Sequence, residues 1–440
     1  MMYRALLLGC ILIGGTRVIA QDWTVALDSV MHLLAKEDFF DGQILIAEKG
    51  KVLFNEAYGD LHVDGESQTL TEDTALPVFS VGKSLTALSV MLLEAEGKLR
   101  YEDPVRKFIP ELPYESVTIR HLLTMTSGLP RFLETALKYA DTTTVMSNPG
   151  ILDLVARHQP EAGAPGVNFQ YNNANYILLA TIVESVSGLP FGTFLEQRIF
   201  QPIGMRHTQE TAPFLPDSLK GKPITADHFF RPYGTGTVAT TATDLFLYDQ
   251  ALYNGQPLSQ AQLQEGFKCM RLKDGSYSNY GFGWRIVNCD TLQEVYHVGD
   301  GPGMRASFQR QLSDQQTLIY LHVGSNVYHQ AVYEIVRAIR KGEPYVLPQK
   351  RLRYNIDTAL YDKYTGSYLS NFGLIHISTS EGRLFLRPDA IPGKEELIPS
   401  SDTTFYFKGQ NLSWEFFLNE QEEVIGFGIE GDRENMGIKQ

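Results

Sequence analysis

Cysteine is scarce in this chain of 440 residues, which has only three, at positions 10, 269 and 289. So few cysteines exclude a disulfide-rich scaffold. A zinc site built on the last two is also excluded, because no histidine cluster accompanies them. In an exported protein Cys269 and Cys289 could form a disulfide, and two buried thiols fit the sequence equally well, because spacing does not define the geometry of the pair.

Positive charge is in deficit as well. Lysine and arginine number 38 against 51 acidic residues, for a net charge of −13. This balance argues against nucleic acid or an anionic membrane as a partner. Apart from the first twenty residues, no stretch approaches the length and apolarity of a transmembrane helix.

Several catalytic and cofactor motifs are missing. The chain has no G-x-S-x-G and no H-E-x-x-H, which excludes an α/β-hydrolase and a zincin protease. The runs 234–239 and 301–306 imitate a dinucleotide fingerprint, but neither sits in a strand–helix–strand unit with an acidic residue at the required distance. We therefore expect no metal and no cofactor.

The N-terminus has the three parts of a secretory signal. Arg4 supplies a positive charge, residues 5–15 form a short apolar core, and Val18-Ile19-Ala20 is a small-residue cleavage site. These features predict a signal peptide over residues 1–20 and an exported protein, periplasmic or extracellular. The alternative is a lipoprotein anchored through Cys10, although few apolar residues precede that position.

The most informative stretch is Ser80-Val81-Gly82-Lys83, an S-x-x-K tetrad at the start of an apolar helix. Residues three apart share a helix face, so the Ser80 hydroxyl and the Lys83 amine can lie side by side. Serine is a weak nucleophile unless a neighbouring group accepts its proton. Unpaired N–H groups at a helix start also favour a developing oxyanion. A helix cap followed by a solvated lysine would explain the tetrad alone equally well.

Two later motifs favour catalysis. Tyr171-Asn172-Asn173 opens a second apolar helix, and His297-Val298-Gly299 closes a β-like run. In this order the chain resembles the serine β-lactamase-like superfamily of class C β-lactamases, penicillin-binding proteins and esterases. The likeness covers roughly residues 25–340. Further matching segments are Thr118 to Leu129, Phe200 to Thr208, Thr240 to Leu245 and Tyr280-Gly281-Phe282-Gly283-Trp284.

The resemblance implies a role for each motif residue. Ser80 would be the nucleophile, Lys83 would accept or relay its proton, and Tyr171 would act as general base and then serve the deacylating water. The remaining motif residues are expected to bind substrate, and they are Asn173, His297, Gly299 and Asp300.

In more detail, Asn173 is expected to hydrogen-bond Lys83 or a substrate amide. The backbone N–H of Asp300 would complete an oxyanion hole with that of Ser80. His297 departs from the lysine of β-lactamases, and a histidine that is partly neutral at pH 7 holds a substrate carboxylate less firmly. Each of these residues also has a purely structural interpretation, as a packed aromatic, a turn residue or a bonded strand histidine.

These motifs predict an exported serine hydrolase that acts through an acyl-enzyme. Its small-molecule or peptidoglycan-type substrate would be a D-amino-acid peptide, an ester, an amide or a β-lactam. The alternative is a catalytically weak penicillin-binding protein that uses the same pocket as a sensor or scaffold.

The predicted fold is α+β, an antiparallel sheet flanked by helices with a helical insertion, followed by a small all-β domain. Apolar periodicity predicts an amphipathic helix carrying Leu27 and Leu34, and a hairpin that turns at Lys49-Gly50. A hydrolase domain over 21–340, a linker over 341–354 and a barrel or sandwich over 355–440 complete the organisation. The β-runs of the last domain recur about every ten residues.

Overall fold

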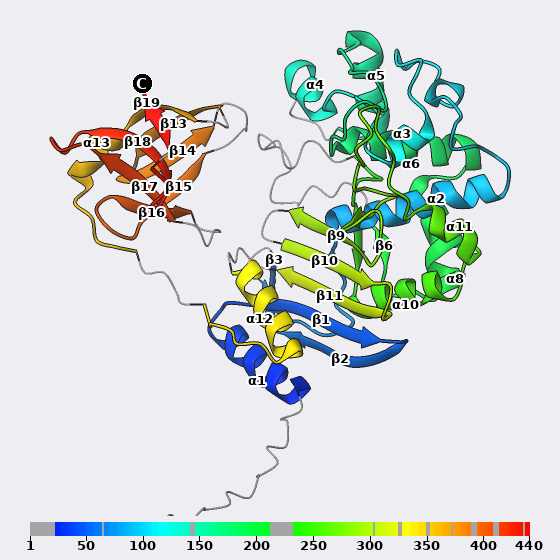
Figure 1. Cartoon of the computed structure of the whole chain (residues 1–440), viewed down its shortest axis with the longest axis horizontal. Coiled ribbons are helices and arrows are strands. Elements are labelled where there is room, and N and C mark those ends of the chain that lie inside the picture. The colour runs from blue at the N-terminus through cyan, green and yellow to red at the C-terminus, as the bar shows by residue number, and fades with distance from the viewer. Residues whose placement is uncertain are drawn as a thin grey trace, which may run out of the picture.

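The computed structural model describes residues 23–63, 66–140, 146–211, 232–301, 304–323, 328–348, 353–370, 373–388, 394–407, 413–433 and 436–440. It confirms the α+β fold, with a sheet and helices followed by a small all-β unit (Figure 1). The predicted signal peptide over 1–20, with Cys10, lies outside the described residues.

A six-stranded antiparallel sheet is the centre of the first unit. Its strand order is β2-β1-β11-β10-β9-β8, so the N-terminal hairpin pairs with strands from about residue 285 onward. The hairpin turns at Lys49 and Gly50, both with positive φ, as predicted. The strands are β1 (Asp41–Glu48), β2 (Lys51–Tyr58), β8 (Arg285–Ile286), β9 (Glu294–Gly301), β10 (Met304–Gln311) and β11 (Gln316–Val323).

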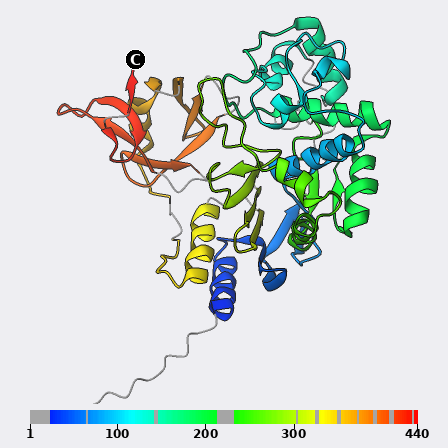
Figure 2. The same cartoon turned by 45° about the vertical axis from the view of Figure 1, so that its right-hand side comes forward.

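Two amphipathic helices cover one face of this sheet, α1 (Trp23–Lys36) and α12 (His329–Lys341). They lie side by side in both views although about 300 residues separate them in sequence (Figures 1 and 2). The predicted apolar stripe of α1 is confirmed, because Leu27 and Leu34 pack with Val332 and Val336 of α12 in one buried cluster.

The helical insertion packs on the other side of the sheet, around α2 and α6, which are apolar on nearly every face. Within the described ranges no single helix is long and apolar enough to cross a membrane. The pair α6 and Phe191–Ile203 passes that test only when joined, and it is bent by 75°. The helices are α2 (Lys83–Ala95), α3 (Ile119–Leu123), α4 (Phe132–Tyr139), α5 (Asn148–His158), α6 (Asn173–Ser187), α7 (Phe191–Leu195), α8 (Gln201–Ile203), α10 (Ala242–Tyr253) and α11 (Gln260–Glu265).

Short strands connect this insertion to the sheet domain. A small sheet of order β5-β7-β6 brings the segment before Ser80 beside the segment after residue 237. A separate hairpin, β3–β4, follows β2. These strands are β3 (Asp60–Val63), β4 (Glu66–Thr69), β5 (Leu76–Pro77), β6 (Gln209–Glu210) and β7 (Val238–Thr240).

The C-terminal unit is a closed eight-stranded antiparallel barrel, which decides between the predicted barrel and sandwich. Buried aromatic rings fill its interior, among them Tyr364, Tyr368, Phe405, Phe416 and Phe427. Its first short helix begins at Thr358, and α12 ends at Lys341. The strands are β12 (Gly366–Ser370), β13 (Gly373–Ser380), β14 (Arg383–Pro388), β15 (Glu395–Pro399), β16 (Thr404–Phe407), β17 (Ser413–Leu418), β18 (Val424–Ile429) and β19 (Gly437–Lys439); β15 and β19 were not predicted.

Candidate active site

The turn that carries Ser80 is strained. After β5 the chain enters a single 3-10 turn, Phe79–Gly82, and α2 begins only at Lys83. Phe79 has φ of +45°, a conformation that a bulky residue adopts only where the surrounding structure holds it there. Ser80 therefore sits in a tight turn just before α2, rather than in the regular helix.

Ser80 and Lys83 are brought together as the tetrad predicted. The Lys83 Nζ lies 2.8 Å from the Ser80 Oγ and donates a second hydrogen bond, of 2.7 Å, to the carbonyl oxygen of Thr235. Lys83 is fully buried, with 0% of its surface exposed. Burial lowers the pKa of its ammonium, which the neighbouring Tyr171 opposes. A lowered pKa makes the neutral amine, the form that can accept the Ser80 proton, more accessible.

Glycine at two positions allows other segments of the chain to pack closely against this turn. A Cβ on Gly299 would lie 2.1 Å from the carbonyl oxygen of Val78 and 3.0 Å from the amide nitrogen of Ser80. A Cβ on Gly236 would lie 2.0 Å from the carbonyl oxygen of Phe79. Neither contact leaves room for a side chain, so glycine at both positions fixes the place of the nucleophile.

Tyr171 lies beside the Ser80–Lys83 pair. The Lys83 Nζ is 5.2 Å from the centre of the half-buried Tyr171 ring. The neighbouring Asn172 caps α6, because its side-chain oxygen accepts from the amide of Ala174 at 3.0 Å.

Asn173, the third residue of that motif, is exposed at the first position of α6. Among the described residues Lys83 donates to Ser80 and Thr235 rather than to Asn173. Beside Tyr171 lies a hollow of about 250 Å³, lined by residues that include Arg131, Phe132 and Asn173. Asn173 is therefore placed to meet a ligand in this hollow.

The structure buries His297, which is 1% exposed. Its Nδ1 lies 2.9 Å from the carbonyl oxygen of Val298, and its Nε2 lies 3.0 Å from the hydroxyl of Tyr280. Burial, followed by the charge of Lys83, lowers the pKa of His297 to about 3. The expectation was a partly charged ring that meets a substrate carboxylate. With its pKa lowered in this way we expect the ring to be neutral at pH 7, and both nitrogens have partners inside the protein.

Gly299 and Asp300 lie in the part of β9 that extends beyond its pairing with β8. β8 pairs with β9 only at Val295 and Tyr296, and the following residues of β9 pack against the Ser80 turn. The Asp300 carboxylate is 64% exposed and lies 3.4 Å from the guanidinium of Arg305. An acidic group thus stands at the rim of the site, next to a strand edge on which a substrate backbone can lie.

Sequence reasoning missed three contributors to the site. Thr235 supplies a carbonyl to Lys83, Tyr280 bonds to His297, and the guanidinium carbon of Arg285 lies 5.1 Å from the centre of the Tyr171 ring. Two of these three residues lie in sequence motifs described above. Thr235 belongs to the run excluded as a nucleotide fingerprint, and Tyr280 opens the Y-G-F-G-W segment, to which no role was given.

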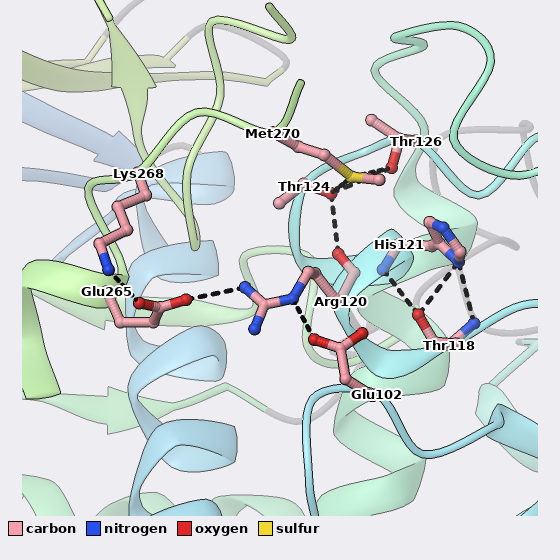
Figure 3. A network of polar contacts seen from close by, with 9 residues as sticks. All are labelled: Glu102, Thr118, Arg120, His121, Thr124, Thr126, Glu265, Lys268 and Met270. Carbon is pink, nitrogen blue, oxygen red and sulfur yellow. Dashed lines mark hydrogen bonds and ion pairs between the residues drawn. The ribbon is translucent and has the colours of Figure 1, made fainter. Parts of the chain in front are cut away.

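A disulfide closes the segment that carries Tyr280 and Arg285. Cys269 and Cys289 are bridged, which decides between the two alternatives left by the sequence. Next to Cys269, the Met270 sulfur accepts hydrogen bonds from Thr124 and Thr126 (Figure 3).

The same close view shows a second anchor at this end of the segment. Arg120 of α3 lies between Glu102 and Glu265, and Lys268 also reaches Glu265 (Figure 3). The residues just before Cys269 are therefore tied to α3 by the Arg120–Glu265 ion pair, and the segment that follows is closed by the disulfide. Within the described residues no group of three or more histidine, cysteine, aspartate or glutamate side chains is arranged to hold a metal ion.

Comparisons with known proteins bear on the family and the fold. Residues 28–310 match the family model described as Beta-lactamase. A penicillin-binding protein of Bacillus subtilis (strain 168) is 33% identical over 432 residues, which cover 90% of this chain and 94% of that protein.

Two solved structures share the fold. The octameric penicillin-binding protein homologue from Pyrococcus abyssi has a TM-score of 0.58 at 21% identity, covering 94% of this chain and 99% of its own. The D-amino acid amidase from Ochrobactrum anthropi SV3 complexed with D-phenylalanine has a TM-score of 0.57 at 20% identity, covering 73% and 98%. At these identities the two structures bear on the fold alone.

Proposed function

The chain belongs to the Beta-lactamase family of serine hydrolases, and on that premise we propose that it is an exported enzyme that acts through an acyl-enzyme on Ser80. The observation that carries this proposal is the contact of 2.8 Å between the Ser80 hydroxyl and the fully buried Lys83 amine. A lysine held out of water beside a serine has little structural benefit, because burying its charge costs free energy. Its value lies in accepting a proton.

The proposed reaction has two stages. Neutral Lys83 takes the Ser80 proton while the Ser80 Oγ attacks the substrate carbonyl, and the backbone N–H groups of Ser80 and Asp300 hold the oxyanion. Tyr171 delivers a proton to the leaving group and recovers it from Lys83. Water then attacks the acyl-enzyme: the Tyr171 hydroxyl passes its proton to neutral Lys83 and accepts one from the water. The ester bond to Ser80 breaks to release the acid, and Lys83 returns its proton to the Ser80 Oγ.

The proposed substrates are a D-amino-acid peptide, ester, amide or β-lactam, as for enzymes of the class C type. Arg285 places a permanent positive charge over Tyr171, and a substrate carboxylate could reach it. Asn173 would bind a substrate amide from the hollow beside Tyr171. With His297 buried and neutral, Arg285 takes over the charge recognition that the sequence assigned to the histidine.

Export is proposed from the N-terminal sequence, with cleavage after Ala20 and a periplasmic or extracellular mature protein. N-terminal sequencing of the protein from its native host tests this proposal. A chain that begins at Gln21 agrees with it, whereas a lipid-modified Cys10 would support the lipoprotein alternative.

The catalytic proposal is tested by acylation of the purified protein. The wild type is incubated with a fluorescent penicillin, with p-nitrophenyl acetate and with a peptide ending in D-alanyl-D-alanine, and adducts are read by intact mass. We expect an adduct that maps to Ser80 and is absent from Ser80→Ala, whose stability should fall by only about 1 kcal/mol through loss of the hydrogen bond to Lys83. An adduct on another residue would refute the assignment. An adduct that forms but never hydrolyses would favour the sensor or scaffold alternative.

A further inference from the structure

The segment Tyr280-Gly281-Phe282-Gly283-Trp284 contains a group that the proposed reaction does not use. The Tyr280 side chain is fully buried, and its hydroxyl lies 3.0 Å from the Nε2 of His297. The rest of the segment also touches the site, because a Cβ on Gly283 would lie 2.6 Å from the Cα of Ser84. A buried tyrosine hydroxyl requires a partner, and here the Nε2 of His297 is one, with the side chain of Tyr176 as a second neighbour.

The hydrogen bonds define which nitrogen of His297 carries the proton. The Nδ1 faces the carbonyl oxygen of Val298 at 2.9 Å, and a carbonyl can only accept. The Nδ1 is therefore protonated, and the Nε2 of a neutral ring is left as an acceptor. The Tyr280 hydroxyl is the donor that satisfies it.

Tyr280 and His297 together form the wall behind Tyr171. The Tyr171 ring centre lies 5.9 Å from that of His297 and 6.0 Å from that of Tyr280. The guanidinium of Arg285 and, when it is protonated, the amine of Lys83 both disfavour protonation of the imidazole. The wall is therefore made of uncharged rings whose orientation depends on the hydrogen bond between them.

We propose that Tyr280 is a positioning residue whose hydroxyl holds His297 as the neutral Nδ1–H tautomer and thereby sets Tyr171 against Lys83. This inference rests on the proposed function for its effect on rate, because Tyr171 is the group it positions. The tautomer itself is a property of the folded protein and does not depend on any substrate.

The first test reads the tautomer directly. The protein is labelled with ¹⁵N-histidine, and the His297 signals are assigned by their loss in His297→Met. We expect one protonated Nδ1 and one bare Nε2 at pH 7. In Tyr280→Phe the Nε2 loses its donor, so we expect its shift to move or the two tautomers to mix. A wild-type ring that is charged, or protonated at Nε2, overturns the proposal even if Tyr280→Phe does not fold.

The second test uses the hydrolysis of p-nitrophenyl acetate. We expect Tyr280→Phe to lower kcat about tenfold with little change in KM, since a hydrogen bond that orients a catalytic group is lost. Tyr320→Phe is the matched control, because Tyr320 is also buried but packs in the cluster under α1 and α12. Its kcat should stay at the wild-type value.

A double-mutant cycle separates positioning from packing. If Tyr280 acts through His297, Tyr280→Phe should cause no further loss of rate in a His297→Met background. Equal losses in both backgrounds would mean that Tyr280 merely packs and would overturn the proposal. A wild type that hydrolyses nothing would instead contradict the proposed function, while the tautomer measurement would still decide the position of the proton.

Discussion

Replacing Gly299 by alanine is expected to displace the nucleophile. The new Cβ would lie 2.1 Å from the Val78 carbonyl oxygen, and real Cβ contacts essentially never fall below 3.0 Å. Strand β9 and the Ser80 turn must therefore separate by about 0.9 Å. A misplacement of about 1 Å at a reacting group can cost about 100-fold in rate. The forced repacking should also cost about 1–3 kcal/mol of stability.

The assay compares kcat for p-nitrophenyl acetate and the rate of acylation by a fluorescent penicillin, alongside denaturant unfolding. Gly163→Ala is the matched control, because neither glycine has a positive φ and the nearest atom to a Cβ on Gly163 is 3.6 Å away. We expect the control to behave as the wild type. A Gly299→Ala protein that is folded and acylates at the wild-type rate would refute the claim that this close approach positions Ser80.

Two further predictions concern stability. Asp249→Asn should lower the free energy of unfolding in guanidinium by about 3–5 kcal/mol. Asp249 and Arg310 form an ion pair of 2.6 Å with 0% and 1% of their side chains exposed, so the variant leaves the buried charge of Arg310 without its partner. Asp103→Asn, which removes the exposed Lys107 pair, should cost less than about 1 kcal/mol, and equal losses would contradict this reasoning. His297 has a pKa of about 3 in the folded protein against 6.5 for the free side chain, so below pH 6.5 the unfolded state binds the extra proton and the native state does not. The unfolding free energy should therefore fall by about 1.4 kcal/mol per pH unit between pH 6.5 and about 3 through this group, and His297→Met should remove that contribution. An unchanged slope in the variant would show that His297 is charged in the native protein.

Much of the fold could be predicted because it depends on short-range patterns. The hairpin at Lys49-Gly50 follows from alternation and a turn that favours glycine, and α12 follows from its apolar stripe. The barrel strands β15 and β19 were missed. β19 is only three residues long, which is too short to show the alternation of apolar and polar residues that predicts a strand. Its pairing with β12 and β18 results from closure of the barrel.

The site divides in the same way. The contact between Ser80 and Lys83 was predictable because residues three apart on a turn are neighbours whatever the rest of the chain does. The position of Tyr171 beside them was expected only through the family resemblance, since its distance from Lys83 depends on how α2 packs against α6.

By itself, then, the sequence determined which groups could react, since residue types and local spacing carry that chemistry. The tertiary structure decided the electrostatic surroundings of Lys83 and His297. It buried Lys83 and placed the Thr235 carbonyl, 152 residues away, against its amine. It also enclosed His297 between Val298 and Tyr280 and so lowered the pKa of a ring that the sequence predicted to be only partly neutral at pH 7. The physical reason is that desolvation depends on atoms brought together from distant segments, and no pattern within one segment encodes what will cover it.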